Sequence, residues 1–356
     1  MKKSLLALAA LTAFAGAASA QSSVTLFGVV DLNLRNVDNG SAGSIKSLST
    51  DGNASSRLGF RGVEDLGGGM KASFWIEGGL SADVGNQGGG NGGVAVAPAS
   101  ASWNRRSTVS LEGGFGEIRL GRDYVATFWN HTVFDVFGTN GVASQTNVMS
   151  PAPTVAPFGN AQTLVRANNV VAYFLPAMGG LYGQFQVAAG ENQLPANKYV
   201  GGRLGYAAGP FNIAVAAGKT SKAGPMAGDM KAFNVGGSFD MGVAKLYGQY
   251  HKYEEGSVKE LKNWYLGVGV PMGAATLKAS YTKTDRTLAV GNEPSSNQLG
   301  LGVVYDLSKR SALYAHYSRV DNDKGLVYTA GVGGPAASAA NGFTSTGYEF
   351  GIRHSF

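Results

Sequence analysis

Five arginines are the residues whose type and spacing suggest chemistry in this chain. They are Arg57, Arg61, Arg106, Arg119 and Arg166. A guanidinium stays protonated at any working pH and can form forked hydrogen bonds to a carboxylate or a phosphate. Rings of arginine or lysine are a known means of drawing anions into a narrow passage. The five residues therefore predict an anion-attracting surface, provided that their side chains share one face.

The phase of the neighbouring apolar residues predicts that most of them do. In a strand with one lipid-facing side, Leu58 and Phe60 would face outward, which turns Arg57 and Arg61 to the opposite side. The same argument turns Arg106 and Arg119 inward in the following segments. The phase does not decide the direction of Arg105.

Arg166 is placed by its position in the chain, because residues 168–175 do not alternate cleanly. The long connection expected to face the arginines, residues 123–164, offers two opposing carboxylates, Asp123 and Asp135. A purely structural role remains open as well. The arginines could pair with acids such as Glu77, Glu112 or Glu117, stiffen a wall and give no ion preference.

Other chemistry has little support in the sequence. The histidines are scattered without a metal-binding or catalytic pattern, and cysteine is absent. Gly88, Gly89 and Gly90 lack the Lys-Ser/Thr that would follow in a phosphate-binding loop. We therefore expect no catalytic residues, no metal and no cofactor, and a protein that is not an enzyme.

The elements that would carry the arginines are short alternating segments of roughly ten residues. Residues 263–270 and 298–305 are clear examples. Seven short connections alternate with eight longer, polar or Gly-rich ones, so these connections join sixteen strands. This alternation predicts an all-β fold, a transmembrane antiparallel up-and-down β-barrel of sixteen strands. A barrel of that size leaves an aqueous channel unless something fills it.

The connection over residues 123–164 is the third of the longer ones, and we expect it to fold into the lumen and narrow it. The first of them is expected near residues 36–54. Short and long connections on opposite ends are what a barrel with tight inner turns and longer outer loops requires.

Both ends of the chain agree with an exported barrel. Lys2 and Lys3, an apolar run and an A-x-A motif ending at Ala20 predict a cleaved signal peptide over residues 1–20 and a barrel domain over residues 21–356. The last strand ends on an aromatic residue, Phe356. The full chain has 29 Lys and Arg against 23 Asp and Glu, and cleavage removes two lysines, which leaves an excess of four positive charges. That excess is too small to imply nucleic acid as a partner.

Four stretches resemble the general porins of β-proteobacteria. They are residues 23–31, 56–72, 115–122 and 351–356. The resemblance covers the whole mature chain and implies a sixteen-stranded homotrimer in the Gram-negative outer membrane, with the third outer loop folded into each pore. It also implies that Arg57, Arg106 and Arg166 stand where the arginines of the family's constriction stand, and that anion preference is common.

The sequence thus favours a passive outer-membrane channel for small anions and hydrophilic solutes, in contact with outer-membrane lipid and lipopolysaccharide. A nonselective or substrate-specific channel is the first alternative. An outer-membrane adhesin or a barrel enzyme is the second. An adhesin would not need an open lumen, and a barrel enzyme such as a lipase would need a Ser/His pair at one membrane level.

Overall fold

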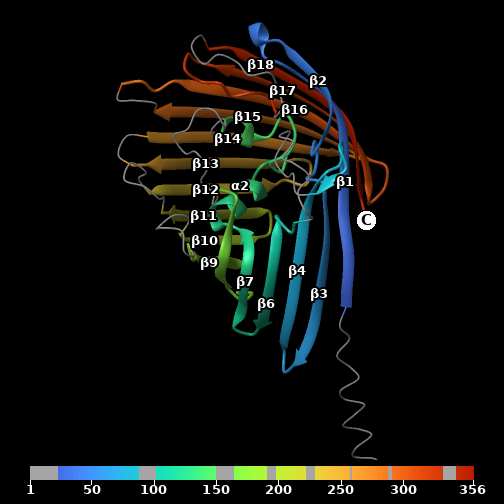
Figure 1. The fold of residues 1–356 in the computed structure, drawn as a ribbon, viewed down its shortest axis with the longest axis vertical. Helices are drawn as coiled ribbons and strands as arrows, with labels where there is room; N and C mark the ends of the chain where they lie inside the picture. Colours follow the sequence, from blue (N-terminus) through green and yellow to red (C-terminus); the bar gives the residue numbers. More distant parts are fainter. Residues whose placement is uncertain are drawn as a thin grey trace, which may run out of the picture.

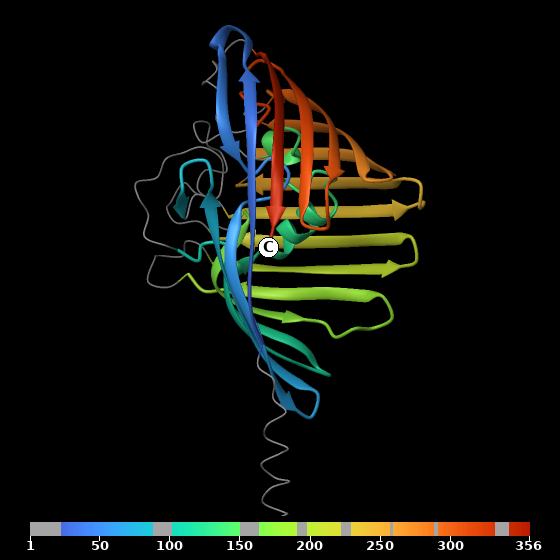
Figure 2. The ribbon, with the colours of Figure 1, turned by 90° about the vertical axis from the view of Figure 1, so that its right-hand side faces the viewer.

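The computed structural model describes residues 23–87, 102–149, 164–190, 198–221, 229–256, 259–287, 291–331 and 342–356 of the chain. Within them, one antiparallel sheet closes on itself, because residues 29–38 of β1 (Ser23–Asp38) pair with β18 (Thr344–Ser355). Figure 2 shows these two strands side by side. The expected signal segment, residues 1–20, lies outside the described residues.

The predicted count of sixteen barrel strands is confirmed for the described part of the chain. The sheet contains eighteen strands, of which β2 (Ser44–Thr50) continues the line of β3 and β5 (Asn86–Gln87) is a two-residue pairing in a connection. The other barrel strands are β3 (Arg57–Gly67), β4 (Met70–Ser81), β6 (Arg106–Gly113), β7 (Gly116–Tyr124), β8 (Arg166–Phe174), β9 (Leu181–Ala188), β10 (Tyr199–Ala208), β11 (Phe211–Thr220), β12 (Met230–Asp240), β13 (Lys245–Glu255), β14 (Lys259–Met272), β15 (Ala275–Thr287), β16 (Ser295–Asp306) and β17 (Ser311–Asn322).

Alternating burial explains why these segments are strands. In β14, Trp264 and Leu266 are exposed, whereas their neighbours Asn263 and Tyr265 are buried. A strand of this kind shows an apolar face to one solvent and a polar face to another. No helix among the described residues is long and apolar enough to cross a membrane.

The first longer connection lies close to its predicted place, between the end of β1 and the start of β3. A connection was predicted near residues 36–54. In the structure, β1 extends to Asp38, a 3-10 turn η1 follows at Gly40–Ala42, and β2 pairs with β1 before β3 begins at Arg57. Residues 51–56, between β2 and β3, form no regular element. There the Asp31 carboxylate accepts hydrogen bonds from the backbone N–H groups of residues 52, 53 and 54, at 2.8 to 3.1 Å. These bonds replace the strand pairing that the chain gives up at this point.

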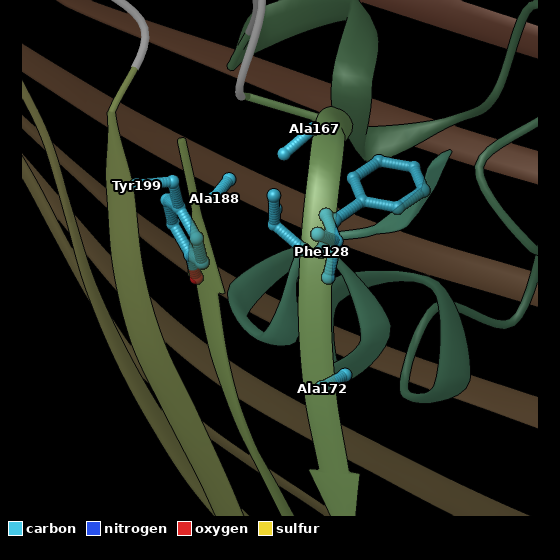
Figure 3. Close-up of a cluster of buried hydrophobic side chains, with 7 residues drawn as sticks. Phe128, Ala167, Ala172, Ala188 and Tyr199 are labelled. Carbon is cyan, nitrogen blue, oxygen red and sulfur yellow. The ribbon is translucent and has the colours of Figure 1, made fainter. Parts of the chain in front are cut away.

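The described part of the longest connection, residues 125–149, contains α2 (Ala126–Val133) and the 3-10 turn η2 (Gln145–Val148). Helix α2 packs against β10, β11 and β12, and η2 lies against β15 and β16 (Figure 1). Under α2, Phe128 joins a buried cluster with Ala167, Ala172, Ala188 and Tyr199 of β8, β9 and β10 (Figure 3). These residues therefore cover one face of the wall.

Candidate functional site

Cross-strand pairing places three of the predicted arginines on one face of the sheet. Arg61 of β3 lies opposite Trp75 of β4, and Arg106 of β6 lies opposite Glu77 of β4. Residues two or four apart on a strand share a face. Trp75 and Glu77 therefore align Arg61 with Arg106, and Arg57 lies on the same face as Arg61.

This face is the inner one. Arg119 of β7 lies opposite Ala172 of β8, and Ala172 belongs to the cluster under Phe128 of α2. The outer face carries exposed apolar side chains instead, such as Val109 and Leu120. The predicted phases of β3, β6 and β7 agree with the structure.

The inner-wall arginines differ in how far acids neutralise them. Arg119 binds both oxygens of Glu117, at 2.7 and 2.9 Å, and Asp123 at 2.6 Å. Arg106 lies 3.7 Å from the same Asp123 oxygen, and its Nε donates to Thr108 at 3.0 Å. Asp123 is thus shared by two guanidiniums.

Three arginines have no ion pair with any described carboxylate. Arg57 is half-buried and Arg61 is exposed to the lumen. Arg166 is buried and donates to the Tyr124 hydroxyl at 3.0 Å, while its Nε has no partner within the described residues. None of the three guanidiniums is therefore held in a direct ion pair, although Glu77 still interacts electrostatically with Arg57 and Arg166 at longer range.

The two acids predicted to face the arginines from the long connection, Asp123 and Asp135, lie in different places from those expected. Asp123 belongs to β7 and lies on the arginine wall itself, because the strand extends to Tyr124. Asp135 does lie in the long connection, but its carboxylate is buried and accepts hydrogen bonds from the N–H groups of Phe137 and Thr139 and from the Tyr265 hydroxyl. Burial raises the pKa of Asp135 above its ordinary value.

Arg105, whose direction the sequence left open, is buried on this wall. Its Nε donates to Glu77 at 2.6 Å and its Nη2 to the Tyr124 hydroxyl at 3.3 Å. The residue precedes the first residue of β6, so strand alternation could not place it. The alternative role of wall stiffening therefore describes Arg105 and Arg119 well.

Arg203 of β10 also lies on the inner face, although it was not among the arginines that we predicted from the sequence. Its Nη2 donates to the Tyr182 hydroxyl at 3.3 Å, its Nε bonds to the Asn130 side chain of α2, and no described carboxylate pairs with it. The alternation of the sequence could have placed it, because Leu204 and Tyr206 form the exposed outer face and Arg203 has the opposite phase.

Aromatic rings lie beneath five of the inner-wall arginines. The guanidinium carbon is 4.1 to 5.5 Å from the ring centre in each case. The pairs are Arg61 with Phe27 and Trp75, Arg106 with Trp75, Arg119 with Phe174, Arg166 with Tyr124, and Arg203 with Tyr182. A ring attracts a cation without neutralising it.

Residues 125–149 are fixed to the inner wall by hydrogen bonds to distant strands. The Asn130 side chain donates to the Ala214 carbonyl of β11 and to Asn234 of β12. The Val142 N–H donates to Glu349 of β18 at 3.1 Å. His131 is fully buried beside His251, with ring centres 4.7 Å apart, and burial lowers the pKa of His131 to about 3.

No group of three or more His, Cys, Asp or Glu side chains within the described ranges could hold a metal ion. A closed barrel with an apolar outer face, a polar inner wall and an inward-packed connection is the architecture of a bacterial outer-membrane channel.

Comparison with known proteins agrees with this class. A family profile described as a Gram-negative porin matches residues 7–325, and the chain belongs to this family. The chain is 38% identical over 369 residues to outer membrane porin protein 32 of Delftia acidovorans, with both chains covered in full. It is 28% identical over 398 residues to a porin of Bordetella pertussis, covering 90% of this chain and 95% of that one. The protein is thus a diffusion channel of the Gram-negative outer membrane.

Among solved structures, an anion-selective porin from Comamonas acidovorans superimposes with a TM-score of 0.80 at 36% identity, covering 94% of this chain and all of the other. A trimer form of OmpT from Vibrio cholerae matches with a TM-score of 0.66 at 14% identity, covering 94% and 99% of the two chains, which shows a shared fold. Fold and family point to a channel rather than an enzyme.

Proposed function

We propose that this channel favours small anions and that the arginine wall gives it this preference. The observation that carries the proposal is that Arg57, Arg61 and Arg166 have no ion pair with a described carboxylate, although they share the wall with paired arginines. The similar structure from Comamonas acidovorans, described as anion-selective, supports the same reading.

The physical basis is an excess of positive charge on a low-dielectric wall. Six guanidiniums (Arg57, Arg61, Arg105, Arg106, Arg119, Arg166) lie on or beside β3, β6, β7 and β8, and the described carboxylates that form ion pairs with them are Glu77, Glu117 and Asp123. Glu112 of β6 lies on the same face and accepts a hydrogen bond from Ser73 instead. A passage lined by one sign of charge raises the local concentration of the opposite ion. Passage also requires that each ion leave, which suits exposed donors better than an enclosed binding pocket.

We also propose that the third outer connection forms the constriction opposite this wall. Helix α2 and residues 134–149 support this, because they are bonded to inner-face residues of β11, β12, β13, β14, β16 and β18. The remainder of the predicted loop, residues 150–163, lies outside the described residues.

The remaining parts of the proposal concern maturation and assembly. We propose cleavage after Ala20, a homotrimer, and contact of the outer apolar face with lipid and lipopolysaccharide. Exposed apolar residues such as Leu34, Leu266 and Phe350 support a face that is covered by lipid or by another subunit.

Planar-bilayer recording of the refolded protein in a potassium chloride gradient tests the anion preference. We expect a reversal potential shifted toward that of chloride. A potential shifted toward that of potassium would reject the arginine hypothesis, and the absence of conductance would argue against a channel of any kind.

A further inference from the structure

We propose that Trp75 is a positioning residue that holds Arg61 and Arg106 on the inner wall and keeps their charges available to passing anions. The inference rests on the proposed anion preference. Trp75 carries no charge, so a count of the charged residues on the wall does not identify it as a residue that affects ion preference.

Trp75 is the point where two guanidiniums meet one ring. The guanidinium carbon of Arg61 lies 5.2 Å from the centre of the indole ring, and that of Arg106 lies 4.6 Å from it. The two arginines come from β3 and β6, the strands on either side of Trp75 in β4. One side chain on the central strand therefore contacts an arginine of each neighbouring strand.

The indole ring is itself held in place. Its Nε1 donates to Glu77 at 3.2 Å, and Glu77 is fixed in turn by Arg105 at 2.6 Å. Phe27 of β1 packs edge-on against the ring, with centres 4.9 Å apart. Phe27 can lie there because residue 59 is glycine, where a Cβ would come within 2.4 Å of the Phe27 ring.

Another arginine of the same wall, Arg119, is held by carboxylates instead of by an aromatic ring alone. Arg119 is bound by Glu117 and Asp123, so its charge is cancelled. Arg106 is already 3.7 Å from Asp123. A ring attracts a guanidinium through its face and takes up none of its N–H donors in conventional hydrogen bonds. The contact with Trp75 therefore fixes Arg61 and Arg106 without itself cancelling either charge, and Arg106 keeps only the longer 3.7 Å pair with Asp123.

The test compares four variants in the same bilayer experiment. Trp75→Leu removes the ring, Trp75→Gln removes the ring but keeps an N–H donor for Glu77, and Trp75→Phe keeps a ring but loses that donor. Phe74→Leu is the matched control, because Phe74 is the next residue on β4, is 37% exposed and faces outward opposite Val109. Entry of a neutral sugar into proteoliposomes measures the width of the pore independently of charge.

We expect the anion-to-cation permeability ratio to fall about threefold in Trp75→Leu and Trp75→Gln, because released guanidiniums can turn toward Glu77 and Asp123. Trp75→Phe should retain most of the preference, and Phe74→Leu should match the wild type. Sugar entry should change little in all four.

Two results would overturn the inference. One is an unchanged permeability ratio in both ring-free variants. The other is a loss of preference in all three Trp75 variants that scales with faster sugar entry, since Trp75 would then only fill space. An anion preference missing from the wild type itself would reject the proposed function, which is a distinguishable outcome.

Discussion

At the scale of single residues, the inner wall shows that an arginine count does not measure a charge. Arg105 and Arg119 are each held by carboxylates within 3 Å, whereas the Arg61 guanidinium lies over two aromatic rings and forms no ion pair with a described carboxylate. An ion pair in which both charges are fixed presents little net field to a passing ion. The preference of the channel should therefore depend on the unpaired members of the wall.

Arg61→Gln tests this dependence. We expect the anion-to-cation permeability ratio to fall about two- to threefold, because one uncancelled charge is removed from the passage. Arg61 is exposed to the lumen and loses its contacts with Phe27 and Trp75, so the free energy of unfolding should fall by about 1 kcal/mol. Reversal potentials and urea unfolding of the folded barrel provide the two measurements.

Arg319→Gln is the matched control for that variant. Arg319 lies on the outer face of β17, is 52% exposed and pairs with Asp321 at 3.0 Å. The same loss of one guanidinium there should leave the permeability ratio unchanged. An equal fall in both variants would mean that total charge, and not the inner wall, sets the preference.

At the scale of elements, residues 125–149 are seated by a close approach at Gly141. Its N–H donates to the Asp51 carbonyl at 3.0 Å. Its φ is +73°, and a Cβ there would lie 2.2 Å from a Glu349 carboxylate oxygen and 2.3 Å from the Gly52 carbonyl oxygen. No side chain fits at this position without moving the segment.

Gly141→Ala should displace this segment, and Gly138→Ala is its control. Gly138 also has a positive φ, +61°, but the nearest atom to its Cβ would be 3.7 Å away. Both variants carry the left-handed backbone cost of about 1 kcal/mol, and only Gly141→Ala adds a clash. We expect larger and noisier single-channel conductance in Gly141→Ala alone. Equal behaviour of the two would mean that this contact does not seat the segment.

His131 makes the same segment sensitive to acid. Its pKa is about 3 in the fold because burial disfavours the imidazolium, against 6.5 ordinarily. The unfolded state then binds more protons below pH 6.5, so stability falls as the pH drops from 6.5 toward 3. Near pH 5 the loss should be about 2 kcal/mol.

The measurement is the unfolding midpoint in urea as a function of pH, for the wild type and for His131→Gln. The two curves should diverge below pH 6.5, with the wild type losing stability faster. The raised pKa of Asp135 acts in the opposite direction and is common to both proteins. Parallel curves would contradict a buried neutral His131.

The strands were predictable because the barrel imposes a period of two, and the phases of Arg57, Arg61, Arg106 and Arg119 followed from it. Arg166 was harder for a physical reason. The register shifts between Gly121 and Asp123 of β7, and Asn169 of β8 has a φ of 56°, so alternation fails beside Arg166. Local irregularities of this kind depend on cross-strand partners and leave no periodic signal.

The positions of Asp123 and Asp135 were out of reach for a related reason. The end of β7 is set by pairing of Tyr124 with Arg166, and the burial of Asp135 is set by Tyr265 from a strand 130 residues away. Which acid meets which arginine is a property of the folded wall. The pattern predicts the face, and tertiary packing decides the partners.

At the scale of the whole molecule, the closed sheet holds the separate arginines in fixed positions, so their charges add to a single electric field in the lumen. The backbone groups of Phe356 and Gly28 exchange two hydrogen bonds of 3.1 Å, which pair the end of the chain with its first strand. A closed wall keeps β3, β4, β6, β7 and β8 in a fixed register around the lumen. The charges on it act together on any ion inside.

A preference that arises from such a field must weaken as salt rises. The screening length falls from about 10 Å at 0.1 M salt to about 3 Å at 1 M, so charges on the wall then reach only ions in near contact with them. We expect the anion-to-cation permeability ratio to decline steadily over this range in reversal-potential measurements with potassium chloride at a constant gradient. Entry of a neutral sugar, measured in parallel, should stay constant, because the width of the pore does not depend on screening. A ratio that holds its value at 1 M salt would mean that ions are selected by direct binding at a single site, and the summed field of the arginine wall would lose its role.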